Sequence, residues 1–295
     1  MKTGMTIPFM EPGWNRQQMK AWAETIDSGP WSSLALGERI TFFNPEFITS
    51  LAACAAWTTR VELISTISVL TMHNPVLMAK QFATIDLISD GRLTVGVGVG
   101  GRKEDYDAIG ADWGKRRLAV LEDSCNTLRR IWKGEQVLEN ARRIVEPLPI
   151  QPGGPKILSG SIGPKSIEAA ARFSDGLSGF SFMASLDEIR QSFQQMNAAW
   201  QNAGREGKPR LIASFWYGLE QKGKEQMQAH LQRYLNFMPK DLVASLLPEA
   251  GFNGSANDLK DFLAEIQAMG ADDVILVPTS RNLDEIRQLA EVLSV

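Results

Sequence analysis

A glycine- and serine-rich loop between a strand-like and a helix-like segment has the composition of an anion-binding site. It reads Ser-Gly-Ser-Ile-Gly-Pro-Lys-Ser over residues 159–166. Pro164 suits the first turn of a helix, and the glycines let backbone N–H groups point outward at the positive end of that helix, where Lys165 adds charge. A plain capped turn is the alternative. The residues predicted to hold a phosphate are Gly160, Ser161, Gly163 and Ser166.

Three glycines alternate with valines in the strand-like segment of residues 93–102. A period of two places Gly96, Gly98 and Gly100 on one face of the strand. Such a row weakens a strand, so it indicates a close approach on that face, either tight packing inside a narrow barrel or a cofactor ring. The spacing also matches the dinucleotide pattern G-x-G-x-x-G, but the glycines lie within the strand and charged residues follow, so that interpretation fails. Gly98 and Gly100 are predicted cofactor contacts.

Glu38, Arg39 and His73 are the predicted charged and acid–base groups of the site. Each follows a strand-like segment, and Glu38 and His73 could transfer protons, while Arg39 could hold an anionic substrate. The alternative for Glu38 and Arg39 is a salt bridge at a helix start. The alternative for His73 is a structural helix cap. His230 lies in a polar helical stretch and is predicted to be a surface residue. Two separated histidines without supporting cysteines predict no metal site.

The segments that carry these residues alternate between strand and helix patterns along the whole chain. Eight strand–helix units in 295 residues predict an α/β fold, a (β/α)8 TIM barrel with insertions after strands at its C-terminal face. An open doubly wound sheet is the alternative, but residues 7–12 lack its glycine fingerprint. No linker divides the chain, so residues 1–295 are predicted to form a single domain. Predicted strands cover residues 6–9, 32–36, 61–70, 93–99, 156–158, 176–180, 211–219 and 273–278, with irregular insertions at residues 101–116, 136–155 and 239–255.

Composition argues against several other classes of protein. The formal net charge of -3 and the pI near 5.6 disfavour a nucleic-acid partner, which needs a clustered basic surface. No apolar run approaches the roughly 18 residues of a membrane span, and no basic-then-apolar leader opens the chain. Cys54 and Cys125 are predicted to be reduced core thiols. Together these features predict a cytoplasmic protein.

A long block of the sequence resembles the bacterial luciferase-like flavin monooxygenase family. It runs from residue 73 to residue 110 and includes Asn-Pro-Val at residues 74–76, Ser-Asp-Gly-Arg at residues 89–92 and Gly-Val-Gly-Val-Gly at residues 96–100. Residues 170–176 and 270–277 also fit the family pattern. The resemblance therefore extends over nearly the whole chain.

This resemblance implies a barrel that binds reduced flavin mononucleotide (FMN), or the related 8-hydroxy-5-deazaflavin coenzyme, with the ring over the mouth. In that family the third strand ends in a bulge with a non-proline cis peptide beside the ring. The bulge would fall near Thr66-Ile67-Ser68 here, so Thr66 and Ile67 are predicted cofactor contacts. The family's phosphate loop follows the fifth strand and matches residues 160–166.

Two departures from the family pattern concern charged residues. The catalytic histidine of the luciferase α-subunit aligns with Glu38 here, which argues against light-emitting chemistry. The luciferase arginine after the fourth strand is replaced by Val99 or Gly100.

The resemblance implies an oxidoreductase. The leading hypothesis is a monooxygenase that uses reduced FMN and dioxygen on a small organic substrate. A partner flavin reductase would supply the reduced FMN. Hydride transfer with the deazaflavin coenzyme is the alternative enzyme, and its acidic tail would need basic groups such as Arg39, Arg102 and Lys103. A non-catalytic flavin-binding protein is the alternative of another class. Barrels of this family commonly form homo-oligomers, which is the expectation here.

Overall fold

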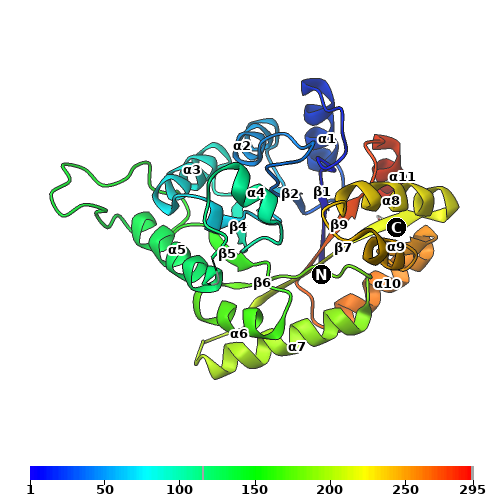
Figure 1. The fold of residues 1–295 in the computed structure, drawn as a ribbon. Coiled ribbons are helices and arrows are strands. Elements are labelled where there is room, and N and C mark those ends of the chain that lie inside the picture. Colours follow the sequence, from blue (N-terminus) through cyan, green and yellow to red (C-terminus); the bar gives the residue numbers. More distant parts are fainter. Residues whose placement is uncertain (115, 294–295) are drawn as a thin grey trace.

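Eight parallel strands close into a barrel in the computed structural model, which describes residues 1–114 and 116–293 (Figure 1). Around the ring the described strands follow the order β1-β2-β3-β4-β5-β6-β7-β9, and β9 pairs with β1 to complete it. This closure confirms the predicted TIM barrel. Residue 115, in the predicted insertion at residues 101–116, and residues 294–295, in the predicted domain, lie outside the described residues. The barrel strands are β1 (Lys2–Thr6), β2 (Ser33–Leu36), β3 (Glu62–Ser65), β4 (Leu93–Val97), β5 (Lys156–Ser159), β6 (Gly176–Ser178), β7 (Arg210–Leu219) and β9 (Asp273–Pro278).

Helices pack around the outside of the barrel and connect its strands (Figure 1). Their ends carry ordinary sequence signals: Asn74 caps the start of α3, with Pro75 in its first turn. The described helices are α1 (Arg16–Ser28), α2 (Phe47–Trp57), the short 3-10 turn η1 (Leu70–Met72), α3 (Pro75–Ile88), α4 (Lys103–Ala108), α5 (Arg117–Trp132), α6 (Pro164–Phe173), α7 (Leu186–Asn202), α8 (Glu220–Tyr234), α9 (Lys240–Leu246), α10 (Ala256–Ala268) and α11 (Leu283–Leu293).

Alternating strand residues form two apolar layers. One set makes a separate fully buried cluster from five different strands, as expected for side chains that point into the barrel. Their strand neighbours, such as Leu34 and Leu63, belong to a larger cluster that includes Trp22 and Phe82 on the surrounding helices. The inner cluster consists of Ala35, Ile64, Leu158, Ile212 and Ile275.

A charged network ties together the first residues of three strands at the opposite end of the barrel from the strand ends that carry the predicted site. Arg210 donates two hydrogen bonds to Glu62, at 2.7 and 2.8 Å, and a third to Asp273 at 2.8 Å. Burial works against the charge of Glu62, but the bonds and charge of Arg210 outweigh it and lower the pKa of that carboxyl. The network therefore stabilises the barrel away from its mouth.

Some predicted boundaries were wrong. Strand β1 ends at Thr6, before Pro8, which has no N–H for a strand ladder, so residues 7–9 lie beyond the strand. Strand β3 ends at Ser65, because the chain then passes through a cis peptide bond between Thr66 and Ile67. That bond falls where the family resemblance predicts it.

The region after β7 differs most from the prediction. Helix α9 lies within the predicted irregular residues 239–255, and helix α10 was not predicted at all. A ninth described strand, β8 (Phe252–Gly254), lies outside the ring and pairs only with the far end of β7, from Tyr217 to Leu219. Side chains here form a small apolar cluster of their own, consisting of Trp216, Met227, Leu231, Leu235, Val243 and Ala250, which we call the outer cluster.

Two predictions about the chain as a whole can be compared with the described residues. Cys54 and Cys125 are free and buried, as predicted, and burial raises the pKa of each thiol to about 12. Among the described helices, none is both long enough and apolar enough to cross a membrane.

Candidate active site

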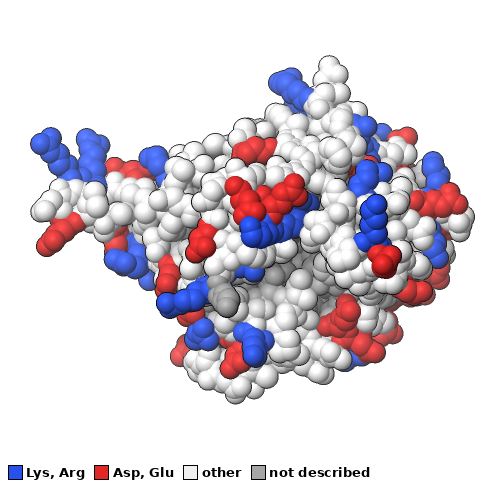
Figure 2. All heavy atoms as spheres, viewed as in Figure 1, with Lys and Arg blue, Asp and Glu red and all other residues white. Residues whose placement is uncertain are grey.

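A cavity of about 710 Å³ lies at the C-terminal ends of the barrel strands. Residues at the ends of all eight barrel strands line it, together with residues of α5 and of the α8–α9 region. The space-filling view shows the hollow in the middle of this face, bordered largely by uncharged residues (Figure 2). Its volume is within the range of cofactor and substrate sites, and its position is that of the active site in other barrels of this fold.

The predicted phosphate loop forms one wall of this cavity. Gly160, Ser161, Gly163 and Ser166 all line it. Helix α6 begins there without a side-chain cap, and the backbone N–H groups of Gly163 and Lys165 have no protein acceptor among the described residues. An uncapped helix start that faces a cavity can bind an anion through these amides.

The serine hydroxyls of this loop form hydrogen bonds within the loop itself. Ser166 donates its hydroxyl hydrogen to the carbonyl of Gly163 at 2.7 Å, and Ser161 donates to the carbonyl of Ser166 at 3.1 Å. These bonds hold the loop in shape. The donors that remain for an anion are therefore backbone amides rather than hydroxyls.

Ile67, after the cis peptide bond, explains two of the glycines. A Cβ atom at Gly98 would lie 2.2 Å from Ile67 Cδ1, and a Cβ atom at Gly160 would lie 2.6 Å from Ile67 Cγ2. A Cβ atom at Gly100, whose φ is +61°, would meet Val69 at 2.7 Å. Gly98 and Gly100 do line the cavity, but protein side chains already occupy the space in front of their α-carbons. Packing therefore explains why Gly98 and Gly100 carry no side chain, and their contact with a cofactor stays a prediction.

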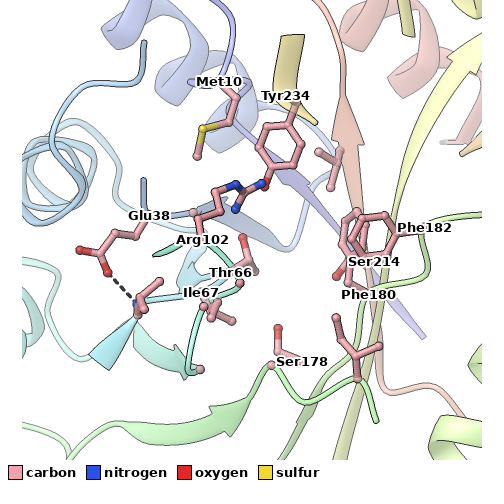
Figure 3. Close-up of a pocket in the computed structure, with 18 of the residues that line it drawn as sticks. Met10, Glu38, Thr66, Ile67, Arg102, Ser178, Phe180, Phe182, Ser214 and Tyr234 are labelled. Carbon is pink, nitrogen blue, oxygen red and sulfur yellow. Dashed lines mark hydrogen bonds between the residues drawn. The ribbon is translucent and has the colours of Figure 1, made fainter. Parts of the chain in front are cut away.

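Glu38 connects the second strand to the segment after the third. Its Oε2 accepts hydrogen bonds from the backbone N–H of Val69 at 2.6 Å and from the hydroxyl of Ser68 at 3.3 Å, as Figure 3 shows for the first. Its Oε1 lies 2.6 Å from Nε2 of His73. With both oxygens occupied, Glu38 holds the cis-peptide segment in place against the cavity.

His73 is behind Glu38 rather than in the cavity. Glu38 lines the cavity and His73 does not, so the imidazole is connected to the cavity only through its hydrogen bond to the Glu38 carboxylate. Burial opposes a charge on His73, but the hydrogen bond and negative charge of Glu38 outweigh it and raise the pKa of the imidazole above its ordinary value. The catalytic roles of both residues stay predictions.

The basic residues named in the sequence have different environments. Arg39 is buried and donates from Nε to Asp105 at 2.7 Å; burial and the nearby charge of Arg102 lower the pKa of Arg39. Lys103 is exposed and pairs with Asp107 at 2.6 Å. Neither lines the cavity, whereas Arg102 does.

Arg102 reaches across the mouth of the cavity. Its guanidinium carbon lies 4.5 Å from the ring centre of Tyr234 and 4.4 Å from that of Phe237, both contributed by the region after β7 (Figure 3). Its Nε is buried without a hydrogen-bond partner, and it forms no ion pair with any described carboxylate.

The prediction for His230 was wrong. Its side chain is 3% exposed, it lines the cavity, and its Nδ1 lies 2.6 Å from Oε1 of Glu11. Met227, His230 and Leu231 form the buried face of α8, at helical spacing. The many polar residues around this narrow face hid it in the sequence.

An aromatic wall opposite the cis-peptide segment was missed by the sequence reasoning. Phe180, Phe182 and Trp216 line the cavity and contact each other edge to face, with ring centres 4.6 to 5.4 Å apart. Figure 3 shows the two phenylalanines facing Thr66 and Ile67. The available signal was their position at or near the C-terminal ends of predicted strands, which face the mouth of a barrel.

Fold and site together define a TIM barrel with an apolar cavity and an uncapped helix start at its mouth. The chain belongs to the luciferase-like monooxygenase family, whose model matches residues 1–276. This confirms the family resemblance. An uncharacterised protein of Mycobacterium tuberculosis is 29% identical over 170 residues, which cover 56% of this chain and 59% of that protein. The match thus spans about three fifths of that relative's length.

Two solved structures show the same fold at low sequence identity. An F420-dependent secondary alcohol dehydrogenase, in complex with an F420–acetone adduct, is 16% identical with a TM-score of 0.79, over 99% of this chain and 97% of the other. The oxygenating constituent of 3,6-diketocamphane monooxygenase from Pseudomonas putida, a type II Baeyer–Villiger monooxygenase in complex with FMN, is 18% identical with a TM-score of 0.75, over 100% of this chain and 97% of the other.

Proposed function

We propose that this protein is a flavin-dependent oxidoreductase that binds reduced FMN and acts as a monooxygenase on a small organic substrate. The observation that carries the proposal is the uncapped start of α6, where Gly163 and Ser166 line an apolar cavity and the amides of Gly163 and Lys165 have no acceptor among the described residues. Family membership supports it, and the neighbouring structures include an FMN complex. A separate flavin reductase is part of the proposal as the source of reduced FMN.

The chain's own residues would bind and orient the coenzyme. The amides of Gly163 and Lys165 would hold its phosphate, while Thr66 and Ile67 would support its ring. Ile67 is suited to that task because Gly98 and Gly160 enclose its side chain and restrict its movement. When bound, reduced FMN supplies the electrons and the dioxygen chemistry.

Other residues of the cavity would control the surroundings of the reaction. The aromatic wall of Phe180, Phe182 and Trp216 excludes water from the side opposite the cis-peptide segment. Glu38 would act mainly by positioning that segment, since both of its oxygens are hydrogen bonded. His73, partly exposed behind it, is placed to exchange a proton between Glu38 and solvent.

The deazaflavin coenzyme F420 is the second candidate, because the fold is shared with an F420-dependent dehydrogenase. Its acidic tail would require several free cations near the mouth. Arg39 is bonded to Asp105 and Lys103 to Asp107, which leaves only Arg102 of the three predicted cations without a carboxylate partner. This distribution of charge favours FMN.

Titration of the purified protein with FMN and, separately, with F420 tests the proposal. We expect FMN to bind in the micromolar range or tighter and to bind more tightly than F420, measured by quenching of coenzyme fluorescence. Riboflavin, which lacks the phosphate, is the matched control and should bind more weakly than FMN. Tighter binding of F420, or equal binding of FMN and riboflavin, would contradict the assignment.

A further inference from the structure

The charges around the cavity mouth are unequal. Asp105 accepts from Arg39, Glu11 accepts from His230 and Arg233, and Glu38 is hydrogen bonded to Val69 and His73, so these three carboxylates are already engaged. Arg102 remains as a cation with no carboxylate partner among the described residues. No described carboxylate is therefore paired with the guanidinium of Arg102, which leaves this cation available to an anionic ligand.

Stacking explains how Arg102 is held but not why it has no acid partner. Its guanidinium carbon lies within 4.5 Å of the ring centres of both Tyr234 and Phe237, and such cation–π contacts stabilise a cation. These ring contacts hold the cation without an acid, and its buried Nε has no hydrogen-bond partner among the described residues. A guanidinium held by aromatic rings, with an Nε donor that has no acceptor, is suited to bind a carboxylate.

The aromatic wall adjoins this cation. Tyr234 packs edge to face on Trp216, with ring centres 5.7 Å apart, so a single ring separates Arg102 from the apolar wall. Figure 3 shows the Arg102 side chain and the two phenylalanines of the wall facing the same space, on the side of the cavity that Thr66 and Ile67 border. A ligand in this space would meet aromatic surface at one end and a guanidinium at the other.

We propose that the substrate of this cavity is a small aromatic carboxylic acid, with its carboxylate paired to Arg102 and its ring packed against Phe180, Phe182 and Trp216. This inference rests on the proposed function, because it names the substrate class of the same site. It also separates two anion sites: the start of α6 for the coenzyme phosphate, and Arg102 for the substrate.

Position in the fold supports two separate sites. Arg102 follows β4, the strand next to β5, but its guanidinium contacts the rings of Tyr234 and Phe237 from the region after β7, whereas the phosphate loop follows β5. Arg39 cannot take the place of Arg102 as the partner of the substrate carboxylate, because Arg39 is buried outside the cavity lining and is hydrogen bonded to Asp105.

The test compares an acid with its neutral amide. Phenylacetate and phenylacetamide are titrated calorimetrically into the wild-type protein, with and without saturating FMN. We expect the acid to bind at least about tenfold more tightly, as for one added charge-assisted hydrogen-bond pair. The Arg102→Gln variant should lose this preference, and Arg102→Lys should retain part of it. Lys103→Gln removes the adjacent, exposed cation and should leave the preference unchanged.

The outcomes separate this inference from the proposed function. Equal affinity of the wild-type protein for acid and amide, or no binding of either, would overturn it. A loss of FMN affinity in Arg102→Gln with the acid preference intact would also overturn it, since the arginine would then serve the coenzyme. If the wild-type protein fails to bind FMN, the proposed function fails, but the acid–amide comparison without FMN still decides the role of Arg102.

Discussion

Replacing Ser166 by glutamate tests whether the start of α6 holds the coenzyme phosphate. Ser166 lies in the first turn of this helix, lines the cavity, and donates its hydroxyl hydrogen to the carbonyl of Gly163. A glutamate here would bring a negative charge to the same amides that the phosphate would use. Glutamine has nearly the same size without the charge, so Ser166→Gln is the matched control.

The expected effect follows from the distance between the two charges. A carboxylate at roughly 5 Å from a phosphate of about -1.5 charge costs about 1 kcal/mol if the mouth behaves as water, and about 5 kcal/mol at an effective dielectric constant of roughly 20. The dissociation constant for FMN should therefore rise by about tenfold to beyond a thousandfold in Ser166→Glu. The glutamine variant loses only the loop hydrogen bond and should bind FMN within a few-fold of wild type.

Quenching of flavin fluorescence measures both affinities, and riboflavin provides a second control. Riboflavin carries no phosphate, so Ser166→Glu and Ser166→Gln should bind it equally. High salt should reduce the difference between the variants for FMN, because ions screen the repulsion. Equal FMN affinity of the two variants at low salt would refute the assignment of the phosphate to this helix.

Three further predictions concern stability. Gly98→Ala should destabilise the protein by about 1 to 3 kcal/mol in urea unfolding, because its Cβ would collide with Ile67 Cδ1. Ile67→Val removes that atom and should restore most of the loss, whereas Gly101→Ala, with no atom within 4 Å of its Cβ, should change little. Arg210→Met should cost about 3 to 5 kcal/mol by leaving two carboxylates unpaired, while FMN affinity stays the same, and unchanged stability would contradict the network. His73→Gln should lower stability more at about pH 5.5 than at about pH 9: the pKa of His73 is raised on folding, so its contribution is complete below its unfolded value of about 6.5 and disappears as pH rises through the folded value. A loss that does not depend on pH would contradict the ion pair.

Most of the barrel could be predicted because strand and helix patterns repeat with clear periods. The region after β7 was predicted less well, because α9 and β8 are short and the helices and strands there depart from strict alternation. Helix α10 had a usable signal: Ser255 and Asp258 form a capping box, in which each side chain binds the other residue's backbone N–H. The cis peptide after β3 was located through the family resemblance, since composition and periodicity do not show peptide geometry.

The candidate site was predictable where it consists of neighbouring residues. The loop at residues 160–166 is such a segment, and its position on the cavity follows from the barrel order. The contact between Arg102 and Tyr234 could not be predicted, because the two residues are more than a hundred positions apart in the sequence and meet only in the fold. Gly98 shows a further limit: the sequence marks a close approach, but only coordinates show that Ile67 is the group that approaches.

The outer cluster has a consequence for how molecules enter the barrel. Apart from Trp216, which lies where β7 pairs with β9, its residues are outside the ring and separate from the main core, so they can lose their structure without breaking the ring of eight strands. Local unfolding of such a part of a protein costs less free energy than unfolding of the whole molecule. We expect amide hydrogens of α8 and α9 to exchange with solvent well before those of the barrel strands. Transient unfolding of α8 and α9 would then open a path through which a coenzyme as large as FMN enters and leaves the cavity.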